Sequence, residues 1–180
     1  MHALRFVIDC AWIVFWIFWL AAASRSKESV RGGWRTQLAG VTTVGVFLIA
    51  GVLRGGSLAV HSVILATAGA LLFACGIALA LCARLHLGSN WGMPMTQRAD
   101  PELVTSGPYR FVRHPIYSGL LAAMLGTALV NSLLGLIVVV VLVPYFYYCG
   151  RVEERNLAAT FPTAYPEYRS RTKMLIPFLL

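Results

Sequence analysis

The sequence predicts an all-α protein, an integral membrane helical bundle of about five transmembrane helices. The last two are expected to form a helical hairpin, followed by a cytosolic C-terminal helical segment. Of the 180 residues, 58% are hydrophobic and only 12% are charged, whereas about one quarter of the residues of a soluble domain are charged. The apolar residues also form runs long enough to cross a hydrocarbon core of about 30 Å. Lipid is therefore the expected solvent for most of the chain.

Three apolar runs come first, over residues 4–23, 38–53 and 58–83. The second is short and needs local thinning of the bilayer or help from flanking residues. The first resembles a signal peptide, but a signal peptide carries its positive charge before the apolar run. Here only Arg5 precedes the run, and four basic residues follow it between positions 25 and 35. We therefore expect a retained first span.

A polar stretch over 84–115 precedes an apolar run over 116–149. That run is too long for one ordinary span, and Asn131-Ser132 near its middle favours a tight turn between two shorter helices. Residues 151–161 suit a helix that leaves the membrane, which Pro162 and Pro166 would then interrupt.

The apolar residues 175–180 are expected to pack back onto the protein or the interface. We expect a single membrane-embedded domain over 1–180. Three spans occupy 1–83, and the functional half occupies 84–180.

Basic residues predict the orientation. With five spans, the segments 24–37, 84–115 and 150–180 share one side and hold 13 of the 15 Lys and Arg. The positive-inside rule makes that side cytoplasmic, so the N-terminus is expected outside and the C-terminus inside, in a bacterial inner membrane. A net charge of +8 can indicate nucleic-acid binding. Because these charges lie in short loops between apolar runs, membrane lipids are the expected partners instead.

The stretch GPYRFVRHPIYSG, residues 107–119, concentrates polar side chains between apolar segments. His114 precedes Pro115, which favours an extended backbone at His114 and the start of a helix just beyond it. The N-terminal end of that helix offers free N–H groups that favour anionic ligand groups. The alternative is an interfacial histidine that faces lipid headgroups.

Two arginines and two tyrosines surround this histidine. Arg110 and Arg113 have the planar fork that suits a carboxylate or a phosphate, although loop arginines also act as topology signals. Tyr109 and Tyr117 are compatible with an aromatic belt at the interface or with the walls of a nucleoside pocket.

Glu153 and Glu154 form a second cluster, directly after an apolar helix. Acidic residues there are costly unless they are paired or solvated. One hypothesis is a local salt-bridge network with Arg151 and Arg155. The other is that one carboxylate accepts hydrogen bonds from hydroxyl or ammonium groups of a ligand.

The remaining polar residues of the apolar runs are expected to serve packing or to lie at the interface. Asp9 and His61 lie toward the extracellular ends of their spans, away from the two clusters. The four cysteines form no CxxC pair and are expected to act as small hydrophobic residues. They are Cys10, Cys75, Cys82 and Cys149. No metal site is expected.

The run LVTSGPYRFVRHPIYSG (103–119), with EERNLAATFPTAYPEYRSR (153–171) and a terminal IP after it, resembles the isoprenylcysteine carboxyl methyltransferase superfamily. Phospholipid methyltransferases belong to the same group. The resemblance covers roughly residues 88–178, and the RHPxY element joined to a later EE element is more specific than either alone. It implies an integral membrane enzyme that binds S-adenosylmethionine (SAM) on its cytosolic side. A lipophilic small molecule or lipidated acceptor would enter from the bilayer.

The resemblance also implies roles for individual residues. Glu153 would hold the polar end of the cofactor, and the segment 101–104 would contact it through the backbone. The residues expected to bind SAM are Pro101, Glu102, Leu103, Val104, Tyr109, His114, Pro115, Ile116, Tyr117, Glu153 and Glu154. The candidate catalytic residues are His114, Arg113 and Arg151.

One position departs from the pattern. The eukaryotic carboxyl methyltransferases place a substrate-binding arginine one helical turn before the cofactor glutamate, where this chain has Cys149. Whether Arg151 replaces that arginine stays open, and so does the acceptor group, which could be a carboxylate, thiol, amine or hydroxyl. The oligomeric state is open as well.

Two alternative functions remain. NADPH-dependent sterol reductases have a similar membrane architecture, but there we would expect an HxxY element without a proline after the histidine. His114-Pro115 therefore favours the methyltransferase. The other alternative is a non-catalytic membrane scaffold.

Overall fold

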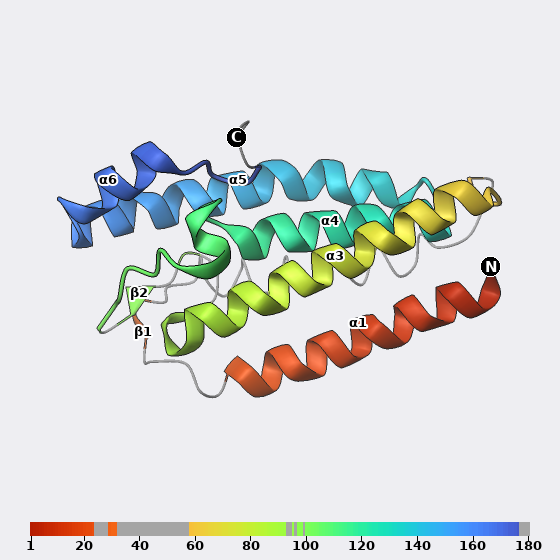
Figure 1. Cartoon of the computed structure of the whole chain (residues 1–180), viewed down its shortest axis with the longest axis horizontal. Helices are drawn as coiled ribbons and strands as arrows, with labels where there is room; N and C mark the ends of the chain where they lie inside the picture. Colours follow the sequence, from red (N-terminus) through yellow and green to blue (C-terminus); the bar gives the residue numbers. More distant parts are fainter. Residues whose placement is uncertain (24–28, 32–57, 93–94, 96, 99, 177–180) are drawn as a thin grey trace.

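The computed structural model describes residues 1–23, 29–31, 58–92, 95, 97–98 and 100–176. Four long helices lie side by side, and a short helix follows the last of them (Figure 1). The helices are α1 (His2–Ala23), α3 (Val63–Leu87), α4 (Pro115–Asn131), α5 (Gly135–Thr160) and α6 (Ala164–Arg171). The second expected span, 38–53, lies outside the described residues, as do residues 177–180.

Short elements lie between the long helices. They are the 3₁₀ helices η1 (Gly88–Asn90) and η2 (Gly107–Arg110), and an antiparallel pair of strands, β1 (Ser29–Arg31) and β2 (Gln97–Arg98). Apart from this one pair, the described residues confirm the predicted helical class. By length and composition, α1, α3 and α5 can each cross a membrane, whereas α4 is a shorter apolar helix.

The third predicted span is shifted along the chain, because α3 runs over 63–87 and the prediction was 58–83. The Ser62 side chain caps its N-terminus by accepting a hydrogen bond from the Leu65 N–H. Gly88, whose φ is +55°, ends the helix and donates its N–H to the Arg84 carbonyl. The prediction that Arg84 begins a polar loop is therefore wrong, since Arg84 lies inside the last turns of α3.

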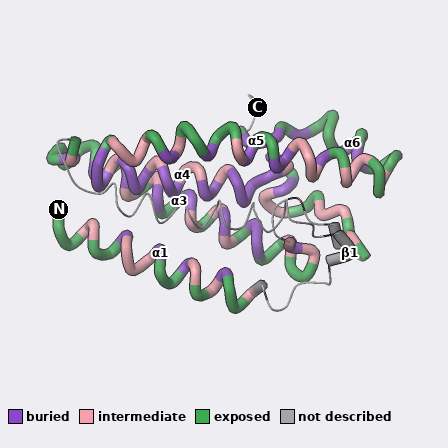
Figure 2. The backbone as a smooth tube through the Cα atoms, turned by 180° about the vertical axis from the view of Figure 1, so that it is seen from behind, coloured by how far each residue is buried: buried purple, intermediate pink, exposed green. Residues whose placement is uncertain are grey.

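Helices α3 and α4 form the buried centre of the bundle (Figure 2). Small residues allow their backbones to approach, as is common between membrane helices. A Cβ at Gly76 would lie 2.5 Å from the backbone N of Ala123, and a Cβ at Gly126 would lie 2.5 Å from the Gly69 carbonyl oxygen. No side chain fits at either position without moving the helices apart.

We expect Gly76→Val to lower the stability of the folded protein by about 1–3 kcal/mol, because the added atoms overlap backbone instead of a movable side chain. Ala74→Val is the matched control, since Ala74 is exposed on the same helix. Thermal unfolding of the detergent-solubilised variants measures both. Equal melting temperatures for the two variants would contradict the close packing of α3 on α4.

Helix α1 packs along α3 and α4 and runs in the same direction as α3 (Figure 1). Trp12 Nε1 donates to Thr127 Oγ1 at 3.0 Å. At the N-terminal end, the Arg5 guanidinium donates to the carbonyls of Val60, at 2.8 Å, and of Val130 and Asn131. The N-terminus of α1, the start of α3 and the end of α4 therefore meet at one end of the bundle.

Helix α4 ends at Asn131, and α5 begins at Gly135 after three intervening residues. Helix α5 continues to Thr160, so the region 151–161 is the last part of the same helix. Pro162 follows its end, but the prediction that Pro166 interrupts helical structure is wrong. Pro166 lies in the first turn of α6, where a backbone N–H would have no partner inside the helix.

The chain after α6 folds back beside the start of α4. Val112 and Lys173 form an isolated parallel bridge, and the backbone N–H of Arg113 donates to the Lys173 carbonyl at 2.8 Å. The His114 N–H donates to the Met174 carbonyl at 3.0 Å. Leu175 is buried. The C-terminal segment therefore fixes the backbone on which His114 stands.

Candidate functional site

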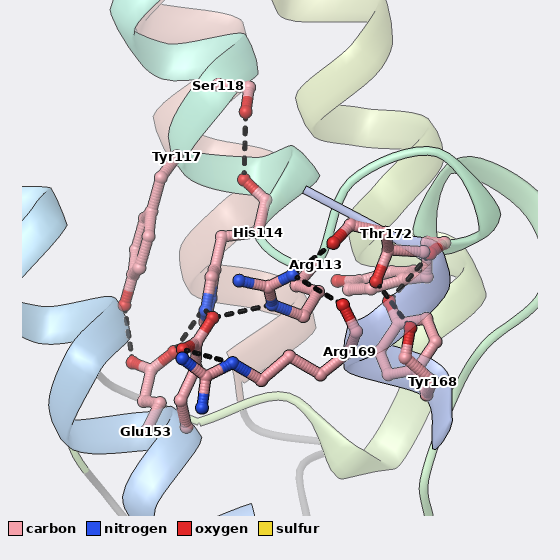
Figure 3. Close-up of polar contacts among 10 residues, drawn as sticks. Arg113, His114, Tyr117, Ser118, Glu153, Tyr168, Arg169 and Thr172 are labelled. Carbon is pink, nitrogen blue, oxygen red and sulfur yellow. Dashed lines mark hydrogen bonds and ion pairs between the residues drawn. The ribbon is translucent and has the colours of Figure 1, made fainter. Parts of the chain in front are cut away.

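The polar cluster lies where the start of α4 meets the later part of α5 and the segment around α6 (Figure 3). His114 is the N-cap residue of α4, and Pro115 is its first helical residue. This position follows from the local sequence, because a proline at the first position of a helix disfavours helical backbone in the residue before it. The His114 side chain points toward α5 and is only 7% exposed.

Glu153 on α5 faces His114 and Tyr117. Its Oε2 lies 3.3 Å from His114 Nδ1. Its Oε1 accepts a 2.5 Å hydrogen bond from the Tyr117 hydroxyl and a 3.1 Å hydrogen bond from the backbone N–H of Met95. Three different segments thus converge on one carboxylate, which remains partly exposed.

Glu154 has a different environment, since it is 4% exposed and paired with arginine. Arg113 Nε donates to its Oε1 at 2.6 Å, and Arg169 Nε lies 4.0 Å from its Oε2. Arg113 also donates to the carbonyls of Thr172 and Arg169. Arg113 therefore joins the start of α4 to α5 and to the end of α6.

The expected local network of Glu153 and Glu154 with Arg151 and Arg155 is wrong in its partners. Within the described residues, both glutamates pair with groups from outside α5. Arg155 is exposed and Arg151 is half-buried. Arg151 and Arg155 each lie two residues from Glu153 and therefore point to other sides of the helix, while Arg113 holds Glu154.

His114 Nε2 has no hydrogen-bond partner among the described groups. Its separation of 3.7 Å from Glu154 Oε1 allows attraction but is too long for a hydrogen bond. Gly150 faces this atom, and a Cβ there would lie 3.1 Å from Nε2. A buried polar atom without a partner costs free energy. A ligand atom that accepts a hydrogen bond from Nε2 would remove that cost.

Burial tends to lower the pKa of His114, but the hydrogen bond to Glu153 and the negative charges of Glu153 and Glu154 outweigh it and raise the pKa above 6.5. The raised pKa favours the cationic form of His114, in which both ring nitrogens are donors. The four charges of Arg113, His114, Glu153 and Glu154 then sum to zero.

The raised pKa predicts how stability depends on pH. Protonation of His114 contributes stability that is fully present below the unfolded pKa of about 6.5 and is lost as pH rises through the folded pKa. We expect the melting temperature of the wild-type protein to fall more between pH 6 and pH 9 than that of His114→Gln. His61→Gln, at an exposed histidine, should keep the wild-type difference. Identical pH profiles for the wild type and His114→Gln would contradict the charged state.

Aromatic rings form a flat wall beside the cluster. The ring of Tyr117 stacks on His114 at a centroid distance of 5.5 Å and on Phe146 at 4.6 Å. Cys149, one turn before Glu153, is fully buried, as expected for a small hydrophobic residue. The site therefore combines a charged group of side chains with an apolar aromatic surface.

The other predicted site residues lie around this cluster. Pro115 and Ile116 are buried in the first turn of α4. Tyr109 is buried in η2, and its carbonyl accepts a 2.6 Å hydrogen bond from the Tyr168 hydroxyl. Arg110 is exposed, with its guanidinium 4.5 Å from the centre of the Phe111 ring.

The segment 101–104 runs between η1 and η2, where the Glu102 N–H donates to Asn90 Oδ1 at 3.3 Å. Its members Pro101, Glu102, Leu103 and Val104 are half-buried or exposed. Asp9 is half-buried on α1 and His61 is exposed before α3, both toward the end of the bundle where Arg5 lies.

Sequence patterns did not point to Met95 or Gly150. Met95 is the only described residue other than glycine with a positive φ, 66°, and this conformation directs its N–H at Glu153. Nothing in the sequence around a methionine predicts that conformation. Gly150 had a weaker signal, since it is a glycine inside a long helical pattern next to the acidic pair.

The chain is similar in sequence to a known family and to several known proteins. The profile of the family described as phospholipid methyltransferase matches residues 64–164. The cobalt-zinc-cadmium resistance protein CzcN of Cupriavidus metallidurans is 35% identical over 106 residues, which cover 58% of this chain and 47% of that protein. The protein-S-isoprenylcysteine O-methyltransferase of Saccharomyces cerevisiae is 36% identical over 85 residues, covering 46% of this chain and 36% of that protein.

A solved structure is also similar. The eukaryotic intramembrane Ras methyltransferase, isoprenylcysteine carboxyl methyltransferase, superposes with a TM-score of 0.59 at 25% sequence identity. The match covers 83% of this chain and 55% of that protein. The chain spans less than half the length of the two relatives named above.

Proposed function

This chain belongs to the phospholipid methyltransferase family, and from that membership we propose that it is a SAM-dependent methyltransferase with a lipophilic acceptor. The acceptor is a small molecule or a lipidated group that partitions into the membrane. The observation that carries the proposal is the buried His114, whose Nε2 has no hydrogen-bond partner in the described structure, beside the partly exposed Glu153.

The residues of the site fit the charges of SAM. Its amino-acid end carries a carboxylate and an ammonium group. His114 Nε2 is a free donor for the carboxylate, and Glu153 has acceptor capacity for the ammonium group.

Methyl transfer from SAM needs little catalytic machinery from the protein. When bound, SAM would supply a methyl group that is already activated on a sulfonium. The chain's own residues would align the reactants and exclude water, which needs a shaped pocket and few polar anchors. Arg113 holds Glu154 and the C-terminal segment, so we assign it a positioning role. Arg151 makes no ion pair with the described site residues, which leaves its catalytic role a prediction.

We further propose five spans, with α4 and α5 as a hairpin and the site on the cytoplasmic side of a bacterial inner membrane. This orientation is supported by the positions of the basic residues, because 13 of the 15 Lys and Arg lie on the proposed cytoplasmic side and two lie on the other side. A reporter fused after Leu180 should be active only in the cytoplasm. External activity would contradict both the orientation and the cytosolic site.

Calorimetry on the protein in nanodiscs tests the proposed function. We expect saturable binding of SAM and no binding of NADPH in a parallel titration. Binding of NADPH alone would favour a reductase related to the sterol reductases, and binding of neither would favour a non-catalytic scaffold. His114→Ala should weaken SAM binding, because it removes the free donor.

A further inference from the structure

Arg84 lies near the C-terminal end of α3 and is 4% exposed. Its Nη2 donates to the carbonyl of Ala22 in the last turn of α1, at 2.7 Å, and its Nη1 donates to the Gly88 carbonyl at 2.7 Å. The C-terminal carbonyls of a helix lack partners inside the helix and carry partial negative charge. One guanidinium therefore satisfies carbonyls at the C-terminal ends of two helices at once.

Two indole rings hold the same guanidinium. Its central carbon lies 4.6 Å from the centre of the Trp91 ring and 6.0 Å from that of Trp19. The two rings meet edge to face at 5.6 Å. Such contacts between a cation and aromatic rings strengthen when water is excluded. Trp91 is the first residue after η1, so the contact ties the start of the segment 91–104 to α3 and α1.

This segment reaches the candidate site. Met95, four residues beyond Trp91, donates its N–H to Glu153. Asn90, directly before Trp91, accepts the N–H of Glu102. The same end of α3 also seats η2, since a Cβ at Gly107 would overlap the His86 ring. Arg84 thus lies at the base of the segment whose backbone contacts the carboxylate of the site.

We propose that Arg84 is a positioning residue for SAM binding, which acts by holding Trp91 and thereby the Met95 N–H against Glu153. The inference rests on the proposed function. The described contacts of Arg84 go to the ends of α1 and α3 and to two indole rings, and none of these is a contact with His114 or Glu153. Its loss should therefore loosen the placement of Trp91 and of the Met95 N–H and weaken SAM binding, while the charged cluster itself stays in place.

Arg5 provides a matched control at the opposite end of the bundle. It also ties α1 to neighbouring helices through backbone carbonyls, those of Val60, Val130 and Asn131. A general loss of helix packing should appear in both arginine variants. A loss of SAM affinity should appear only in the Arg84 variants.

The test measures SAM affinity by calorimetry and melting temperature in nanodiscs for the wild type, Arg84→Ala, Arg84→Lys and Arg5→Ala. We expect Arg84→Ala to raise the Kd for SAM about tenfold, a plausible size for a residue acting through others. Arg84→Lys should recover part of this loss, because the charge remains but one ammonium cannot reproduce the planar fork. Arg5→Ala should lower the melting temperature and leave the Kd unchanged.

The outcomes separate the two proposals. If the wild type does not bind SAM, the proposed function is wrong and the role of Arg84 falls with it. If the wild type binds and Arg84→Ala binds equally well, or if Arg5→Ala weakens binding to the same degree, only the inference about Arg84 is overturned. Should Arg84→Ala fail to fold, Arg84→Lys decides. Wild-type affinity would overturn the inference, and weaker binding at an unchanged melting temperature would support it.

Discussion

Glu153→Gln is expected to weaken SAM binding by about 100-fold, which corresponds to about 2.7 kcal/mol. The wild-type carboxylate accepts hydrogen bonds from Tyr117 and Met95 and faces the ring of His114. An amide of the same shape removes the negative charge and presents N–H groups to some of these donors. The substitution therefore removes the proposed partner of the SAM ammonium group and also disturbs the donors that surround it.

Calorimetry with SAM measures the effect, and Glu167→Gln is the control. Glu167 is exposed on α6 and pairs only with Arg171 four residues later, so its replacement should change neither binding nor folding. Melting temperatures distinguish lost binding from lost structure. A Glu153→Gln variant that binds SAM as tightly as the wild type would remove Glu153 from the site.

Local sequence rules predicted the parts of the fold that depend on neighbouring residues. The apolar runs predicted α1 and α4 closely, and the His114-Pro115 pair predicted where α4 begins. The boundaries of α3 deviated because they depend on a capping serine and a glycine with positive φ, Ser62 and Gly88. Hydropathy placed Arg84 outside the helix, although the distant end of α1, the end of its own helix and two indole rings stabilise it inside.

The sequence predicted which residues gather at the candidate site, but it did not predict which of them pair with one another. The motif named His114, Tyr117 and both glutamates, and the structure brings them together. Which glutamate pairs with which cation depends on contacts between residues 36 to 59 positions apart in the chain, and sequence spacing carries no such information. The same holds for Met95, whose contribution is a backbone N–H that every residue except proline possesses.

The ion pair of Arg113 with Glu154 carries the second large prediction. We expect Arg113→Ala to lower the free energy of unfolding by about 3–5 kcal/mol, because it leaves the charge of Glu154 buried without its closest partner. The carbonyls of Thr172 and Arg169 lose a donor in the same step. Unfolding in mixed micelles, followed by tryptophan fluorescence, measures the loss. Arg171→Ala is the control, since it breaks an exposed pair with Glu167 and should cost less than about 1 kcal/mol.

A double variant separates the charge from the packing. Arg113→Met combined with Glu154→Leu removes both charges and keeps apolar volume, so it should be more stable than Arg113→Ala alone. If the double variant is equally unstable, the main contribution of Arg113 is its hydrogen bonds to the α6 segment and not its pairing with Glu154. SAM binding by the double variant tests how the charge of Glu154 affects His114. His114 would keep Glu153 but lose the charge of Glu154, so the pKa of His114 should fall, and the affinity for SAM should decline at a lower pH than in the wild type.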